Sequence, residues 1–131
     1  MSNRKVITII ITMVLSSTMV INSCKNSKST VTPTVSFTKD IIPILTTSCA
    51  LNTQCHSGTT NAGLNLDLDS SVAYVSITTN KDHLLLGSSP TATLLYTEVE
   101  SGEMPKPPNS PLSANQISLI LNWIKQGALN N

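Results

Sequence analysis

The chain begins with a basic and then apolar stretch. Arg4 and Lys5 precede residues 6–20, which carry no charge and are mostly apolar. This order is typical of a secretory signal sequence. The apolar run is too short and too rich in Ser and Thr for a membrane-spanning helix, which needs about 20 predominantly apolar residues. We therefore expect residues 1–23 to be removed on export.

A polar segment follows. Residues 25–36, KNSKSTVTPTVS, are rich in Ser and Thr and show no apolar period, which indicates a flexible linker. Fully extended, this stretch spans at most ~40 Å. The pattern thus divides the chain into a signal sequence at 1–23, a linker at 24–36 and one domain at 37–131.

The domain opens with apolar residues at helical spacing. In the segment FTKDIIPIL, Asp40 is placed as an N-cap. Pro43 falls in the first turn, where backbone N–H groups have no partner within the helix, so the helix loses no hydrogen bond to proline. We predict a helix over residues 41–48. It ends directly before Cys49.

The middle of the domain has weaker signals. The leucines of GLNLDL, from Leu64 on, alternate with polar residues and predict a short extended piece. A helical turn over residues 71–77, capped by Asp69 or Ser70, is predicted after it. The segment SPTATLLYTEV begins with a cap and a first-turn proline, which predicts a helix that Gly102 ends.

The last segment has the strongest amphipathic pattern. Ser113 and Gln116 form a capping box, and Leu112 and Ile117 occupy the positions of a hydrophobic staple. Gly127 follows as a helix stop. We predict a long amphipathic helix packed on the domain. Its apolar stripe comprises Ile117, Ile120, Leu121 and Ile124, with Trp123 beside it.

The composition of the chain shows that large side chains for a core are scarce. Aromatic residues make up 3% of the chain, and a domain of this size with so few bulky groups is marginal by surface-to-volume scaling. A bound haem would fill such a centre, although a core of Leu and Ile alone is also feasible. The aromatic residues are Phe37, Tyr74, Tyr96 and Trp123.

Charge narrows the choice of partners. Without residues 1–23 the chain has six Lys against seven Asp and Glu, a formal charge of minus one. It contains no basic run that could follow a phosphate backbone. We therefore expect no nucleic-acid partner.

The residues INSC at the end of the signal sequence resemble a bacterial lipobox, in which the cysteine is acylated. Cys24 would then carry lipid and hold the protein on a bacterial membrane, because each buried methylene contributes ~0.8 kcal/mol. Lys25 is not the Asp that retains some lipoproteins on the inner membrane, which favours the outer membrane. We expect a periplasmic or cell-surface location, where the remaining thiols, Cys49 and Cys55, are paired or used for a cofactor.

The segment CALNTQCH is the main candidate site. A haem attachment motif reads Cys, two residues, Cys, His, and here five residues separate Cys49 from Cys55. The longer loop adds only ~0.8 kcal/mol of closure entropy, so a stretched haem site is one hypothesis. A disulfide between the two cysteines is the second. The third is a zinc site formed with His56 and His83.

A single methionine lies beyond the signal sequence. Met104 is set between Gly102 and Pro105, and the prolines that follow stiffen its loop. A stiff loop suits a weak axial bond to a haem iron, whereas core methionines more often lie on helix stripes. We predict Met104 as an axial ligand, with His83 as the alternative.

Five segments together resemble the small monohaem cytochrome c-like domains of exported bacterial proteins, especially from Bacteroidetes and Planctomycetes. The resemblance implies an all-helical (all-α) fold around one covalently attached haem c. It also implies thioethers at Cys49 and Cys55, with His56 as proximal and Met104 as distal ligand. The segments, besides the Cys-His pair, are FTKDIIPIL, GLNLDL, SPTATLLYTEV, GEMPKPP and LSANQISLILNWIKQGA.

These features predict an exported, membrane-anchored c-type cytochrome that exchanges electrons with redox partner proteins and is not an enzyme. Two alternatives stay open. One is a haem-free structural or interaction lipoprotein with a disulfide between Cys49 and Cys55. The other is a ligand-sensing or peroxidase-like haem protein in which Met104 detaches from the iron.

Overall fold

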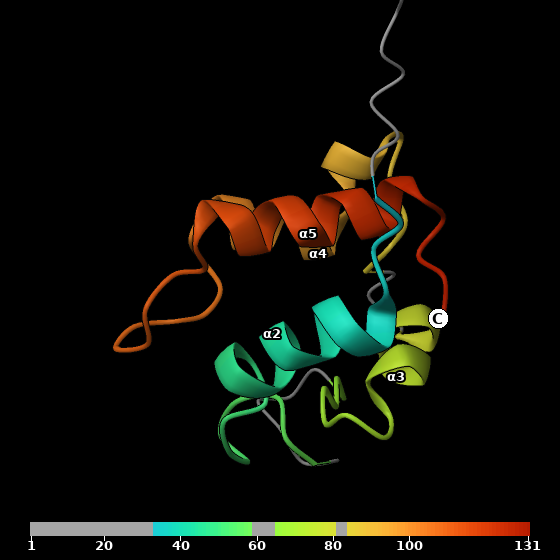
Figure 1. The fold of residues 1–131 in the computed structure, drawn as a ribbon. Coiled ribbons are helices and arrows are strands. Elements are labelled where there is room, and N and C mark those ends of the chain that lie inside the picture. Colours follow the sequence, from blue (N-terminus) through green and yellow to red (C-terminus); the bar gives the residue numbers. More distant parts are fainter. Residues whose placement is uncertain (1–32, 59–64, 81–83) are drawn as a thin grey trace, which may run out of the picture. The chain divides into compact units, whose positions relative to one another are not determined.

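The computed structural model describes residues 33–58, 65–80 and 84–131. These residues form a small all-helical domain with four α-helices, and no strand occurs among them (Figure 1). The all-α prediction is confirmed at this level. The α-helices are α2 (Ile42–Ser48), α3 (Ala73–Thr79), α4 (Leu94–Glu100) and α5 (Ala114–Lys125), with a π-helix η1 (Phe37–Ile41) before α2 and a 3-10 helix η2 (Pro90–Ala92) before α4.

Several predictions fall outside the described residues: the signal sequence, the lipidated Cys24, most of the linker, Leu64 and His83. Residues 33–36, assigned to the linker on sequence grounds, contact the helical domain. The Val35 N–H donates to Gln126 Oε1 at 2.8 Å, and Val35 is buried. In the described part of the chain, no helix is both long and apolar enough to cross a bilayer.

The first helical run begins earlier than predicted, at Phe37. Ser36 is its cap, because its hydroxyl accepts the Lys39 N–H at 3.2 Å. Asp40 is therefore not the N-cap, and that prediction was wrong. Its carboxylate instead accepts the Ser36 N–H at 2.7 Å, so Asp40 satisfies the backbone of the residue that caps the helix.

The segment between the candidate motif and α3 is buried without pairing as a strand. Leu66 and Leu68 are buried. Asn65, however, adopts a positive φ of 48°, which interrupts an extended backbone. The Leu68 N–H donates to the His56 carbonyl at 2.7 Å, which links this segment to the candidate motif.

Helix α3 lies two residues later than predicted and has no side-chain cap. The prediction that Asp69 or Ser70 caps it was wrong. The Asp69 carboxylate accepts the Ser57 hydroxyl at 3.1 Å, while its carbonyl accepts the N–H groups of Val72 and Ala73. Because the side chain has another partner, the helix starts from a backbone turn.

The predicted helix after Ser89 is split in two. Thr93 between η2 and α4 is extended, with ψ of 142°, and its hydroxyl donates to the Pro90 carbonyl at 2.9 Å. This bond satisfies the carbonyl locally and favours a break. Gly102 follows α4 with a φ of +79°, a conformation that favours glycine.

Helix α5 agrees with the sequence most closely. Ser113 and Gln116 form the predicted capping box, with the Ser113 N–H donating to Gln116 Oε1 at 2.9 Å. Gly127 has the positive φ of a helix stop, +93°. Trp123 lies deeper than predicted, because it is fully buried and donates its Nε1–H to the Leu129 carbonyl at 2.9 Å.

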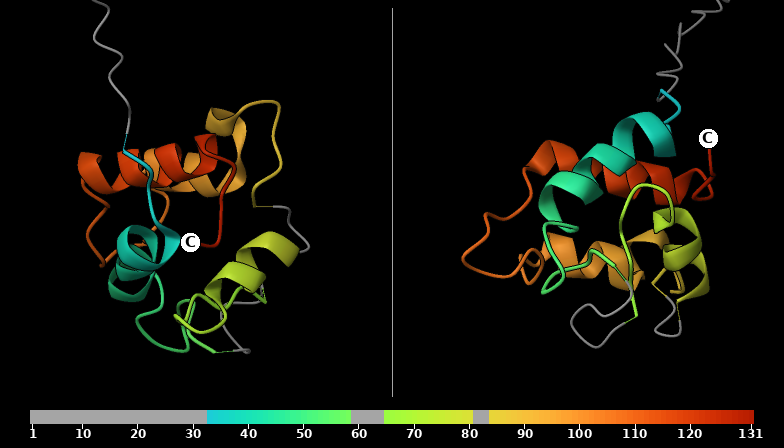
Figure 2. Two further views of the ribbon diagram at one scale, coloured as in Figure 1. Left: turned by 45° about the vertical axis from the view of Figure 1, so that its right-hand side comes forward. Right: turned by 90° about the horizontal axis from the view of Figure 1, so that it is seen from below.

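The aromatic residues join η1, α3 and α5. The ring of Phe37 lies 5.1 Å from that of Trp123 and 5.2 Å from that of Tyr74, centroid to centroid. Helix α5 packs against α4 and η1 (Figures 1 and 2), and the Asn131 carbonyl accepts the Thr38 N–H. These rings hold the helices together without lining the pocket described next.

Candidate functional site

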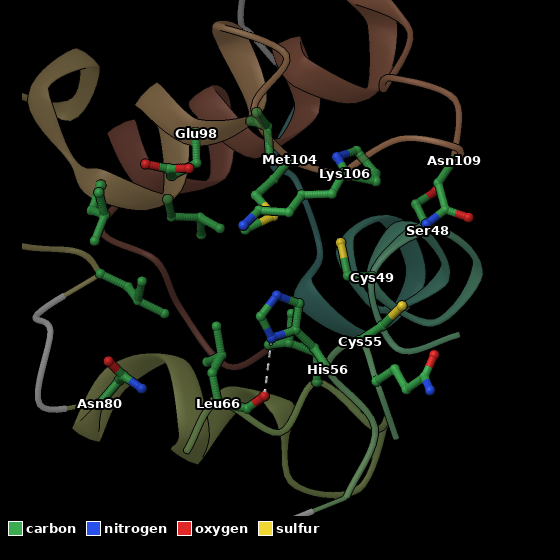
Figure 3. Close-up of a pocket in the computed structure, with 17 residues that line it drawn as sticks. Ser48, Cys49, Cys55, His56, Leu66, Asn80, Glu98, Met104, Lys106 and Asn109 are labelled. Atoms are coloured by element: carbon green, nitrogen blue, oxygen red, sulfur yellow. Dashed lines mark hydrogen bonds between the residues drawn. The ribbon is translucent and has the colours of Figure 1, made fainter. Parts of the chain in front are cut away.

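A pocket of about 430 Å³ opens among the helices (Figure 3). Its volume falls within the ~300–1,000 Å³ typical of ligand sites. Most of its walls are apolar side chains. It is lined by Ser48, Cys49, Gln54, Cys55, His56, Leu66, Leu68, Asn80, Leu84, Leu94, Leu95, Glu98, Val99, Met104, Pro105, Lys106 and Asn109.

All four predicted haem-binding residues line this one pocket. Cys49 is the C-cap of α2, Cys55 and His56 lie in the turn that follows, and Met104 comes from the loop after α4. In Figure 3 the two cysteines lie on one side of the pocket, and Met104 lies across it from His56. The fold thus brings two separate segments together at one site.

The residues between the cysteines of CALNTQCH form an exposed loop, of which Gln54 also lines the pocket. Residues 51–54 are exposed, and the His56 N–H donates to the Cys49 carbonyl at 3.0 Å across the base of the loop. Within the loop, the Asn52 side-chain oxygen accepts the Gln54 N–H at 2.8 Å, which forms an Asx turn. The long spacing therefore leaves both cysteines and the histidine at the pocket wall.

Both cysteines are free thiols. Burial and, to a smaller extent, the neighbouring Cys55 together raise the pKa of Cys49 from 9.0 to about 11. A protonated thiol is a poor zinc ligand, because zinc binds the thiolate. Among the described residues no group of three His, Cys, Asp or Glu side chains is arranged to hold a metal ion. His83, the fourth residue of the zinc hypothesis, lies outside them.

His56 is oriented by a backbone carbonyl. Its Nδ1 lies 3.3 Å from the Leu66 oxygen, and we assign a proton to Nδ1 on this geometry. Nε2 then carries the lone pair, and Figure 3 shows the second ring nitrogen turned away from Leu66. Burial lowers the pKa of His56, with the Leu66 bond partly opposing the shift. A neutral, oriented imidazole is the form that ligates a metal.

Met104 is held by its main chain. Its N–H donates to the Glu98 carbonyl at 3.0 Å, which fastens the loop to the last turn of α4. The next residue, Pro105, is buried, and the Asn109 N–H closes the loop on the Lys106 carbonyl at 3.1 Å. Two backbone hydrogen bonds thus hold the loop that carries the thioether.

The residues present fit a covalently attached haem with His and Met ligation. Two free thiols stand on one side of an apolar pocket, and an imidazole nitrogen and a thioether stand on opposing sides. This donor set is the one that c-type cytochromes use. The aliphatic walls would exclude water from such a group.

Sequence reasoning missed three contributors. The Leu66 carbonyl that orients His56 cannot be recognised from residue types, because any residue supplies a carbonyl. Glu98 and Lys106 also line the pocket. The helical spacing of Glu98 from Leu94 and Leu95 was a usable signal for its position, and so was the place of Lys106 two residues after Met104.

Comparison with known proteins adds no relative. No family model, curated protein or solved structure matches this chain. The function is therefore argued from the residues and their geometry.

Proposed function

We propose that this protein is an exported, lipid-anchored monohaem c-type cytochrome that carries electrons between redox partner proteins. One observation supports the proposal above all: Cys49, Cys55, His56 and Met104 line a single apolar pocket, although the chain separates Met104 from the other three. A disulfide loop alone would require neither the oriented imidazole nor the thioether.

Each residue has a defined task in this proposal. Cys49 and Cys55 would hold the haem by thioether bonds, and His56 Nε2 and Met104 Sδ would hold the iron. The Leu66 carbonyl keeps the imidazole in position, because it fixes Nδ1. The haem supplies an iron that alternates between the ferric and ferrous states. Because His56 and Met104 would both hold the iron, no position on it would remain for a substrate, which favours a carrier over an enzyme.

A haem stain on a denaturing gel tests the attachment. The protein is produced in cells that mature c-type cytochromes, and we expect the stain to persist, because thioether bonds survive denaturation. The Cys49→Ser, Cys55→Ser double variant should lose the stain, and the exposed-site control Ser110→Ala should keep it. An exported wild type that shows no stain and contains a disulfide would support the structural lipoprotein instead.

Carbon monoxide tests the carrier role. We expect the spectrum of the reduced protein to stay unchanged when carbon monoxide is added, because Met104, on the loop fastened to Glu98, would already hold the iron. A prompt spectral change in the wild type would contradict the carrier role and support ligand sensing or peroxidase-like chemistry.

A further inference from the structure

The face of α4 that lines the pocket contains one charged residue. Leu94, Leu95, Glu98 and Val99 all line the pocket, at the spacing of a single helix face, and three of the four are aliphatic. Glu100, on the same helix, is exposed and does not line the pocket. Glu98 therefore places a carboxylate on a helix face whose other pocket-lining side chains are aliphatic.

Local structure couples Glu98 to the loop of the proposed ligand. Its carbonyl accepts the Met104 N–H at 3.0 Å, its side chain is half-buried, and Figure 3 shows it on the Met104 side of the pocket. It also lies in the last turn of α4, where the negative end of the helix dipole disfavours a carboxylate. Neither burial nor the helix dipole accounts for an acid at this position.

We propose that the Glu98 carboxylate is a potential-setting residue that favours the ferric state at this site, an inference that rests on the proposed function. Reduction transfers one electron from a one-electron donor protein to the iron, with no bond made or broken and no proton moved. A negative charge near the iron opposes that gain of negative charge. For a unit charge at ~10 Å and an effective dielectric constant of ~20, the ferrous-to-ferric ratio changes on the order of tenfold.

Lys106 allows the direction of the charge effect on the ferrous-to-ferric ratio to be checked. It lines the same pocket with the opposite charge, but its side chain is exposed. Solvent and salt screen an exposed charge more than a half-buried one. Its influence on the potential should therefore be opposite to that of Glu98 and smaller.

The test compares two variants that remove the same charge from the same helix. Glu98→Gln and Glu100→Gln are produced with covalent haem and titrated with redox mediators at pH 7 and low salt. At a fixed ambient potential we expect the ferrous-to-ferric ratio to rise about tenfold for Glu98→Gln and less than threefold for Glu100→Gln. Lys106→Gln should lower the ratio, and Glu98→Asp, which keeps the charge, should stay near the wild type.

The possible outcomes are distinct. Equal shifts for Glu98→Gln and Glu100→Gln would overturn the inference while leaving the proposed function intact. Loss of haem from Glu98→Gln but not from Glu98→Asp would assign Glu98 a structural role and would also overturn it. A wild type that shows no covalent haem on the stained gel would remove the proposed function and this inference together.

Discussion

At the residue scale, His56 shows how one backbone group decides the chemistry of a side chain. The Leu66 carbonyl binds Nδ1, so the lone pair lies on Nε2, and burial lowers the pKa of the ring, which favours its neutral form. The adjacent Cys-His pair could be recognised from the sequence, but its orientation could not. It depends on Leu66, which reaches the site because Leu68 is bonded to the His56 carbonyl.

The raised pKa of Cys49 predicts that the stability of the haem-free protein falls at alkaline pH. The folded pKa is about 11, above the ordinary 9.0, so the folded chain keeps this proton when the unfolded chain loses it. The free energy of unfolding should be unaffected below pH 9 and fall by up to ~3 kcal/mol as pH rises to about 11. Urea unfolding under reducing conditions measures the decline.

The control for this prediction is Cys49→Ser, which should lack that part of the decline. Haem-attached wild type should lack it too, because a thioether sulfur has no proton to lose. If wild type and Cys49→Ser lose the same stability between pH 9 and 11, the proposed burial of the thiol is wrong.

We predict that substitution of Met104 allows carbon monoxide to bind the haem iron. Met104→Ala should keep its covalent haem, because the cysteines lie on another side of the pocket, and its reduced spectrum should change when carbon monoxide is added. The neighbouring Glu103→Gln serves as control and should behave as wild type. An unchanged spectrum for Met104→Ala would show that another residue, such as His83, is the sixth ligand.

At the element scale, agreement between sequence and structure depended on where polar side chains find partners. Helix α5 was predictable because Ser113 and Gln116 satisfy each other within one turn. The π-helix before α2 was missed because Asp40 bonds back to Ser36, and the break at Thr93 was missed because its hydroxyl binds the Pro90 carbonyl. From residue types alone, a polar side chain could form a hydrogen bond with several neighbours. Which bond forms depends on the conformation of the folded backbone.

Because the loop of CALNTQCH is exposed, we predict that the protein still binds haem when this loop is shortened. Residues 51–53 are exposed, so deleting them should leave the pocket intact and create the usual two-residue spacing. We expect the haem-to-protein ratio of this variant to equal or exceed that of the wild type. A variant that replaces the three residues by Gly and Ser at the same length should match the wild type.

The outcome that contradicts this prediction is specific. A shortened protein that is exported and helical but carries no haem, beside a haem-containing wild type, would show that the long loop is required for attachment.

At the scale of the whole molecule, membrane attachment and haem binding should be separable. All residues of the pocket lie between Ser48 and Asn109, whereas the proposed lipid is on Cys24. Cys24→Ser should move the protein from the membrane fraction to the soluble fraction without changing its haem content. Ser23→Ala, which keeps a small residue before the cysteine, should stay with the membrane.

Membrane retention of Cys24→Ser after a carbonate wash would contradict lipid anchoring at this residue. Such a result would leave the haem proposal untouched, because the pocket is built entirely within residues 48–109.

The most direct test of the account is the intact mass of the exported wild type, made in cells that mature c-type cytochromes. We predict the mass of residues 24–131 plus lipid plus one haem, with the haem on the peptide that contains Cys49 and Cys55. A mass equal to that of the polypeptide and lipid alone would contradict the central claim.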